Sequence, residues 1–121
     1  MTYESVVHVE SQVAPGVTLT IRKMSYGRRA GLMRRIRELA RRQEFLRASE
    51  EPADKMDVAL IETEINREYV KWGLQSVSGL TVDGEEATPE ILSESGPEDL
   101  FREALEAVRR QTGLSAEERK N

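Results

Sequence analysis

Hydrophobic and polar residues alternate near the start of the chain and then recur at helical spacing over most of its length. Val17-Thr18-Leu19-Thr20-Ile21 places its aliphatic residues on one face, and Ser5-Val6-Val7-His8-Val9 is rich in β-branched residues, so each segment predicts a β-strand. Ala14-Pro15-Gly16 between them is typical of a turn. Two strands alone are marginal in water, so we expect residues 1–24 to form a two-stranded β ribbon that packs on other elements.

The first predicted helix follows this ribbon. Ser25 can cap its N-terminus with the side-chain hydroxyl. An apolar stripe then continues along the helix, with arginines on the remaining surface, and comprises Leu32, Ile36, Leu39 and Leu46. Gly27 and Gly31 weaken the first turns, and close packing of the ribbon on this part of the helix is the interpretation that we favour for them.

The second predicted helix begins at Pro52, a residue favoured in the first turn, and extends to about Ser76. One apolar face comprises Val58, Ile61, Ile65, Tyr69 and Trp72, and a second comprises Met56, Ala59, Leu60 and Leu74. Two apolar faces indicate a helix that is sandwiched between other elements, so we expect it at the centre of the core.

The elements after the second helix are short, except for the last. Residues 80–84 predict an extended piece and a turn, and residues 88–92 predict a helical turn capped by Thr88. The third long helix ends at Gly113 and is indicated by apolar residues at i, i+3, i+4 and i+7, namely Phe101, Ala104, Leu105 and Val108. Residues 115–118 have the pattern of a capping box.

Together these elements predict a mainly α protein, with an N-terminal two-stranded β ribbon followed by three principal helices and a short helical turn. The chain of 121 residues fits a single domain, which we divide into the ribbon (1–24), a helical body (25–113) and a C-terminal tail (114–121). The predicted core comprises Leu32, Ile36, Leu39, Leu60, Ile61, Ile65, Trp72, Phe101, Leu105 and Val108.

The composition removes several classes of functional site. The chain has no cysteine and one histidine, so thiolate nucleophiles, cysteine-based metal sites and paired-histidine motifs are excluded. The single histidine, His8, has no Ser, Cys or Asp around it in a pattern that would suggest a catalytic site. Residues 83–94 lack the ligand spacing of a calcium-binding loop. The longest apolar run, Val58-Ala59-Leu60-Ile61, is too short to cross a membrane. We therefore expect a small intracellular protein that is not an enzyme and has no cofactor, metal site or membrane association.

Charge is distributed unevenly along the chain. Residues 22–47 carry ten basic and two acidic side chains, whereas residues 48–121 carry eight basic and eighteen acidic ones. The arginine-rich helix could bind nucleic acid, but no helix-turn-helix spacing or aromatic stacking pattern accompanies it, so this is the weaker hypothesis.

Two other interpretations of the arginine-rich helix stay open. It could contact an acidic protein, including the acidic half of a second copy in a weak homo-oligomer, or it could be a solvated face paired with the chain's own glutamates. The candidate partner-binding residues are Arg28, Arg34, Arg35, Arg41, Arg42, Tyr69 and Trp72.

Four segments of the C-terminal half and the entry into the basic helix share turn residues and spacing with a known family. They are Lys71-Trp72-Gly73-Leu74, Val77-Ser78-Gly79-Leu80-Thr81-Val82-Asp83-Gly84, Ala87-Thr88-Pro89-Glu90-Ile91-Leu92, Leu114-Ser115-Ala116-Glu117-Glu118-Arg119-Lys120-Asn121 and Met24-Ser25-Tyr26-Gly27-Arg28-Arg29. With these segments the chain resembles tail assembly chaperones of long-tailed bacteriophages.

The resemblance implies a mainly helical, non-enzymatic protein of the host bacterial cytoplasm. Such a protein binds the tape measure protein and helps tail tube subunits to assemble around it, without remaining in the virion. The family often has a longer, frameshifted form, and Arg119-Lys120-Asn121 can be encoded by a slippery sequence. The alternative hypotheses are a structural tail or connector component and a small nucleic-acid-binding protein that uses the arginine-rich helix.

Overall fold

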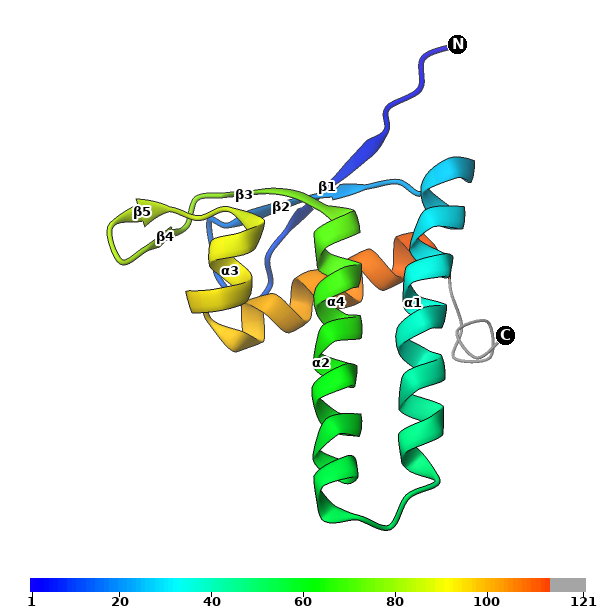
Figure 1. The fold of residues 1–121 in the computed structure, drawn as a ribbon. Coiled ribbons are helices and arrows are strands. Elements are labelled where there is room, and N and C mark those ends of the chain that lie inside the picture. Colours follow the sequence, from blue (N-terminus) through cyan, green and yellow to red (C-terminus); the bar gives the residue numbers. More distant parts are fainter. Residues whose placement is uncertain (114–121) are drawn as a thin grey trace.

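The computed structural model describes residues 1–113, which form a three-stranded sheet, a small β hairpin and four helices (Figure 1). The strands are β1 (Val6–Glu10), β2 (Thr18–Arg22), β3 (Leu74–Ser78), β4 (Thr81–Val82) and β5 (Glu85–Glu86), and the helices are α1 (Tyr26–Arg47), α2 (Pro52–Gly73), α3 (Pro89–Ser95) and α4 (Glu98–Thr112). The predicted fold class, mainly α with an N-terminal β hairpin followed by helices, is confirmed. The predicted tail at 114–121, with its capping box, lies outside the described residues.

The N-terminal ribbon gains a third strand that the sequence pattern did not predict. The sheet is antiparallel in the order β1-β2-β3, with Val7 opposite Ile21 and Leu19 opposite Val77. The prediction that the second helix extends to Ser76 is therefore wrong, because α2 ends at Gly73 and the chain continues as β3. Pairing with β3 satisfies backbone groups of β2 that would otherwise form an open sheet edge.

The core lies where α4 packs against both α2 and β2. Leu19 and Ile21 of β2 are fully buried there, as are Ala104 and Val108 of α4. Gly73 allows this close approach, because a side chain at that position would overlap Val108 Cγ1. One cluster of buried hydrophobic residues thus joins the sheet to the helices.

Helices α1 and α2 form an antiparallel hairpin that extends well beyond the sheet and α4 (Figure 1). The predicted cap is confirmed, since Ser25 Oγ accepts a hydrogen bond from the Arg28 backbone N–H at 3.2 Å. We expected the ribbon to pack closely on Gly31, but its nearest neighbour is Trp72 of α2: a Cβ at Gly31 would lie 2.9 Å from a carbon of the Trp72 ring. The first turns of α1 are therefore held against the end of α2.

Helix α2 packs against α1, α3 and α4, as expected of a central helix, but the predicted burial of its second apolar face is wrong. Ile61 and Ile65, on the first face, are buried, but Met56 and Leu60, on the second face, are 69% and 59% exposed. The reason is the projection of the hairpin, since among the described residues neither the sheet nor α4 reaches this part of α2. Of the other predicted core residues, Trp72 and Phe101 are half-buried and the rest are buried.

Candidate functional site

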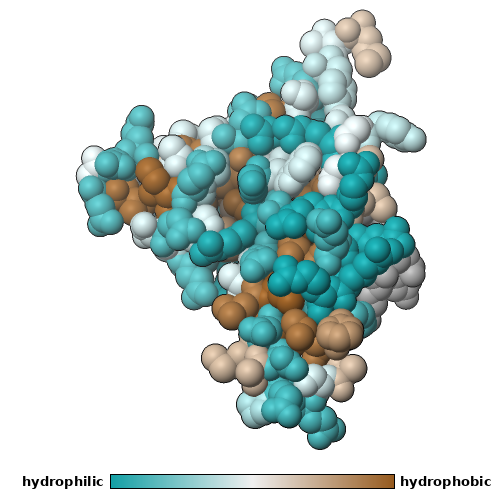
Figure 2. All heavy atoms as spheres, viewed as in Figure 1, coloured by the Kyte–Doolittle hydropathy of each residue, from teal (hydrophilic) through white to brown (hydrophobic). Residues whose placement is uncertain are grey.

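The free end of the α1–α2 hairpin, residues 41–60, exposes three large apolar side chains and is called the hairpin tip below. Phe45 on α1 is 81% exposed, and Met56 and Leu60 on α2 are exposed as stated above. Figure 2 shows hydrophobic side chains among hydrophilic ones over this lower part of the molecule. Scattered exposed apolar residues are ordinary, but three in one short region indicate a surface that contacts another molecule.

A shallow hollow on one face of the tip is lined by both helices. It is bordered by Arg41, Arg42, Phe45, Leu46 and Asp57. Leu60 follows Asp57 by three residues in α2, so the two side chains lie on the same side of that helix. The hollow thus combines apolar residues with charges of both signs, and Leu60 lies about one turn beyond it on α2.

Arg34, Arg41 and Arg42, three of the predicted partner-binding residues, are exposed on α1. None of them forms an ion pair with another residue of the described part of the chain. Arg34 and Arg41 are seven residues apart and lie on the same side of the helix, and Phe45 follows Arg41 by one turn. The outer side of α1 thus carries positive charge, without an ion pair among the described residues, next to an exposed aromatic ring.

Arg35, another predicted partner-binding residue, forms ion pairs within the hairpin. Its Nε lies 3.4 Å from Glu68 Oε1 in α2, and its Nη1 lies 3.4 Å from Glu38 Oε2 in α1. Hydrogen bonding to the Glu68 carboxylate raises the pKa of the Arg35 guanidinium further above its already high value. Arg35 therefore stays charged, and its donors are directed towards the protein's own carboxylates.

Arg28 and Trp72 also form a contact within the hairpin. Arg28 Nη1 donates a hydrogen bond to the Trp72 carbonyl oxygen at 3.3 Å, and the guanidinium carbon lies 5.8 Å from the centroid of the indole ring. This pair satisfies a carbonyl at the C-terminal end of α2 and covers one side of the half-buried indole. Both residues are placed to stabilise the junction of the hairpin with the body.

The prediction that Tyr69 binds a partner is wrong. The side chain is 1% exposed, and the Arg109 guanidinium carbon of α4 lies 5.0 Å from the ring centroid. Arg109 Nη2 in turn donates to Asn66 Oδ1 at 2.9 Å. Because Tyr69 lies on the side of α2 that faces α4, it belongs to the core.

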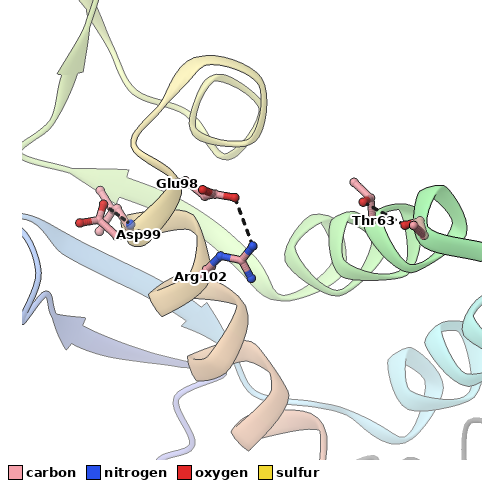
Figure 3. A network of polar contacts seen from close by, with 6 residues as sticks. Thr63, Glu98, Asp99 and Arg102 are labelled. Carbon is pink, nitrogen blue, oxygen red and sulfur yellow. Dashed lines mark hydrogen bonds and ion pairs between the residues drawn. The ribbon is translucent and has the colours of Figure 1, made fainter. Parts of the chain in front are cut away.

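A second hollow, between α2, α3 and α4, is a weaker candidate because its charged residues are already paired. Figure 3 shows Arg102 beside Glu98, with Nη2 and Oε1 3.1 Å apart. On the same hollow, Arg67 pairs with Glu94 at 2.9 Å, and Thr63 donates its hydroxyl proton to a carbonyl of its own helix. Few polar groups are left there to bind a ligand.

Two further kinds of site were searched for among the described residues. Residues 1–113 contain no group of three His, Asp or Glu side chains that could hold a metal ion. No helix within the same range is long and apolar enough to cross a membrane. Comparison of the chain with protein-family models, curated proteins and solved structures found no match.

Phe45, the most exposed of the three apolar residues at the tip, was not among the predicted partner-binding residues. A signal was present, because Phe45 lies away from the Leu32-Ile36-Leu39 stripe on a helical projection. A large aromatic residue among arginines on the polar side of an amphipathic helix is a contact candidate, since burial in its own core is geometrically excluded. No comparable feature of the local sequence indicated that Met56 and Leu60 are exposed.

Proposed function

We propose that the protein is a non-enzymatic tail assembly chaperone of a long-tailed bacteriophage, which binds the tape measure protein and promotes assembly of the tail tube around it. In this role it acts in the host bacterial cytoplasm and contacts tail tube protein as well. The sequence resemblance supports this proposal, and so does a surface suited to binding protein. The hairpin tip is the region that we assign to the client.

The exposed apolar side chains of the hairpin tip carry the proposal. Phe45, Met56 and Leu60 lie on two helices with a hollow beside them, which suits an amphipathic helix of the client. A tape measure protein is long and helical, with apolar stripes that are exposed before assembly, and covering such a stripe removes apolar area from water at both surfaces. At roughly 25 cal/mol per Å², each large side chain covered contributes about 1.5–3 kcal/mol before the cost of ordering.

The direct test is co-expression with the tape measure protein. We expect the native chain to keep the client soluble and to co-purify with it, and we expect the Phe45→Ala and Leu60→Ser double variant to lose most of the retained client. Tyr26→Ala is the matched control, because Tyr26 is an aromatic residue on α1 that is 95% exposed at the opposite end of the helix. Equal retention by all three proteins would exclude the tip as the client site.

Two alternatives have tests of their own. A structural tail or connector component would be found by mass spectrometry of purified particles, whereas a chaperone that leaves the virion would be absent from them. A nucleic-acid-binding role is favoured only by the exposed arginines of α1, and the salt dependence of DNA binding tests it.

A further inference from the structure

The apolar residues of the hairpin tip lie between a basic helix and an acidic one. On the α1 side, Arg42 is exposed and forms no ion pair with a described residue. On the α2 side, Asp57 and Glu64 are exposed, and neither has an ion-pair partner within residues 1–113. Each edge of the surface therefore carries charge that no ion pair within residues 1–113 neutralises.

These residues share one face of the hairpin. Asp57, Leu60 and Glu64 follow each other at i, i+3 and i+7, so they lie on one side of α2. Asp57 also borders the hollow that Arg42 and Phe45 line from α1. We call this surface, formed by Arg42, Phe45, Asp57, Leu60 and Glu64, the tip face.

We propose that the tip faces of two copies of this chain pack on each other around a two-fold axis parallel to the hairpin. That rotation places α1 of one copy over α2 of the other, so Arg42 meets the partner's Asp57 and Glu64, and Phe45 meets the partner's Leu60. A two-fold axis perpendicular to the hairpin would instead place α1 over α1 and bring arginine against arginine. The charges thus select one of the two face-to-face arrangements, and the surface is complementary to itself.

This pairing rests on the proposed function, because it assigns a second occupant to the surface that binds the client. The paired tips cover Phe45 and Leu60 while no client is present, and a client helix with a higher affinity for the surface displaces the second copy. The interface is confined to one face of a helical hairpin, which belongs to the small, transient class with a Kd of roughly 10 µM to 1 mM. Its charged rim makes the affinity fall as salt rises.

The test is sedimentation of the full chain over a range of concentrations at low and high salt. We expect a reversible monomer–dimer equilibrium. Arg42→Glu should raise the dimer Kd at least about tenfold. A variant that combines Asp57→Lys and Glu64→Lys should raise it by a similar factor. Joining the three substitutions in one chain restores the opposite charges across the interface. That combined variant should return to within about threefold of the native Kd.

Arg37→Glu is the matched control, because Arg37 is also exposed on α1 without an ion pair but lies on the other side of the helix from Arg42. It should leave the dimer Kd unchanged. A native chain that stays monomeric at about 1 mM and low salt overturns the proposal. It is also overturned if Arg37→Glu weakens association as much as Arg42→Glu does, since the charge asymmetry of the chain would then act without a defined face.

The outcome is separable from that of the proposed function. A monomeric chain that still retains the tape measure protein contradicts the self-pairing and leaves the chaperone proposal standing. A dimer that follows the expected charge pattern but retains no client contradicts the chaperone proposal and leaves the self-pairing standing.

Discussion

At the scale of single residues, two helical glycines differ in the space around them. A side chain at Gly73 would overlap Val108 in the core, whereas a Cβ at Gly27 would meet nothing within 4 Å. Both residues reduce helix stability through backbone entropy, so only the space around them distinguishes their roles. The close crossing of α4 over α2 depends on Gly73.

We expect Gly73→Ala to destabilise the protein by about 1–3 kcal/mol, because α4 must shift away from α2. Gly27→Ala should stabilise it by about 0.5–1 kcal/mol, because the helix gains propensity without a clash. Urea denaturation of both variants measures the two free energies of unfolding. Destabilisation of similar size in both would show that close packing at Gly73 has no special role.

Residue roles were predictable where they depend on local chemistry. The cap at Ser25 and the cap at Thr88 are both present, with Thr88 Oγ1 accepting from the Ile91 N–H at 3.1 Å. The role of Tyr69 was not predictable in the same way, because whether an aromatic residue on an apolar helix face is buried depends on which element covers it. The element that covers Tyr69 is α4, whose Arg109 lies about forty residues further along the chain.

At the scale of elements, the hairpin contains a buried polar side chain between its two apolar rows. Gln43 is 3% exposed, and its Nε2 donates to the Val58 carbonyl at 3.1 Å and to Glu62 Oε2 at 3.0 Å. These bonds join the two helices near the tip, beyond the reach of the sheet. They fix the register of α1 against α2 where the tip face is formed.

Gln43→Ala should cost about 1–3 kcal/mol, because it removes two hydrogen bonds and leaves space between the helices. Arg37→Ala, at an exposed position of the same helix, should change stability by less than about 0.5 kcal/mol. Thermal unfolding followed by circular dichroism compares the two variants. Equal stability of both would mean that Gln43 is not needed to join the helices.

The elements themselves were largely predictable, because helix periodicity, caps and turns are encoded locally. The exception is β3, where the residues after Gly73 continue an apolar pattern that suits helix or strand. Its conformation is decided by pairing with β2, which precedes it by more than fifty residues. The exposed side of α2 was missed for a related reason, since an apolar face predicts burial whether or not a neighbour is present.

At the scale of the whole molecule, charge is the feature that separates protein binding from nucleic-acid binding. The exposed arginines of α1 face solvent, but the acidic residue Asp57 of α2 lines the same hollow as Arg41 and Arg42 at the tip. A phosphate backbone would meet both signs of charge there. The surface therefore suits a protein partner better than a duplex.

We expect DNA binding to be weak at physiological salt and to involve few phosphates. A gel shift at several salt concentrations gives the slope of log affinity against log salt, which is about one unit for each phosphate contacted on duplex DNA. A steep slope with sub-micromolar affinity at physiological salt would favour the nucleic-acid hypothesis. Loss of that binding in an Arg34→Glu and Arg41→Glu variant would then assign it to α1.

The central claim is that the hairpin tip is the surface that holds the client. Hydrogen exchange of the chain, measured by mass spectrometry alone and in complex with the tape measure protein, tests it most directly. The account predicts slower exchange in residues 41–60 of the complex and little change in β1 and β2, at the other end of the molecule. Unchanged exchange at the tip together with protection of the sheet would contradict the claim.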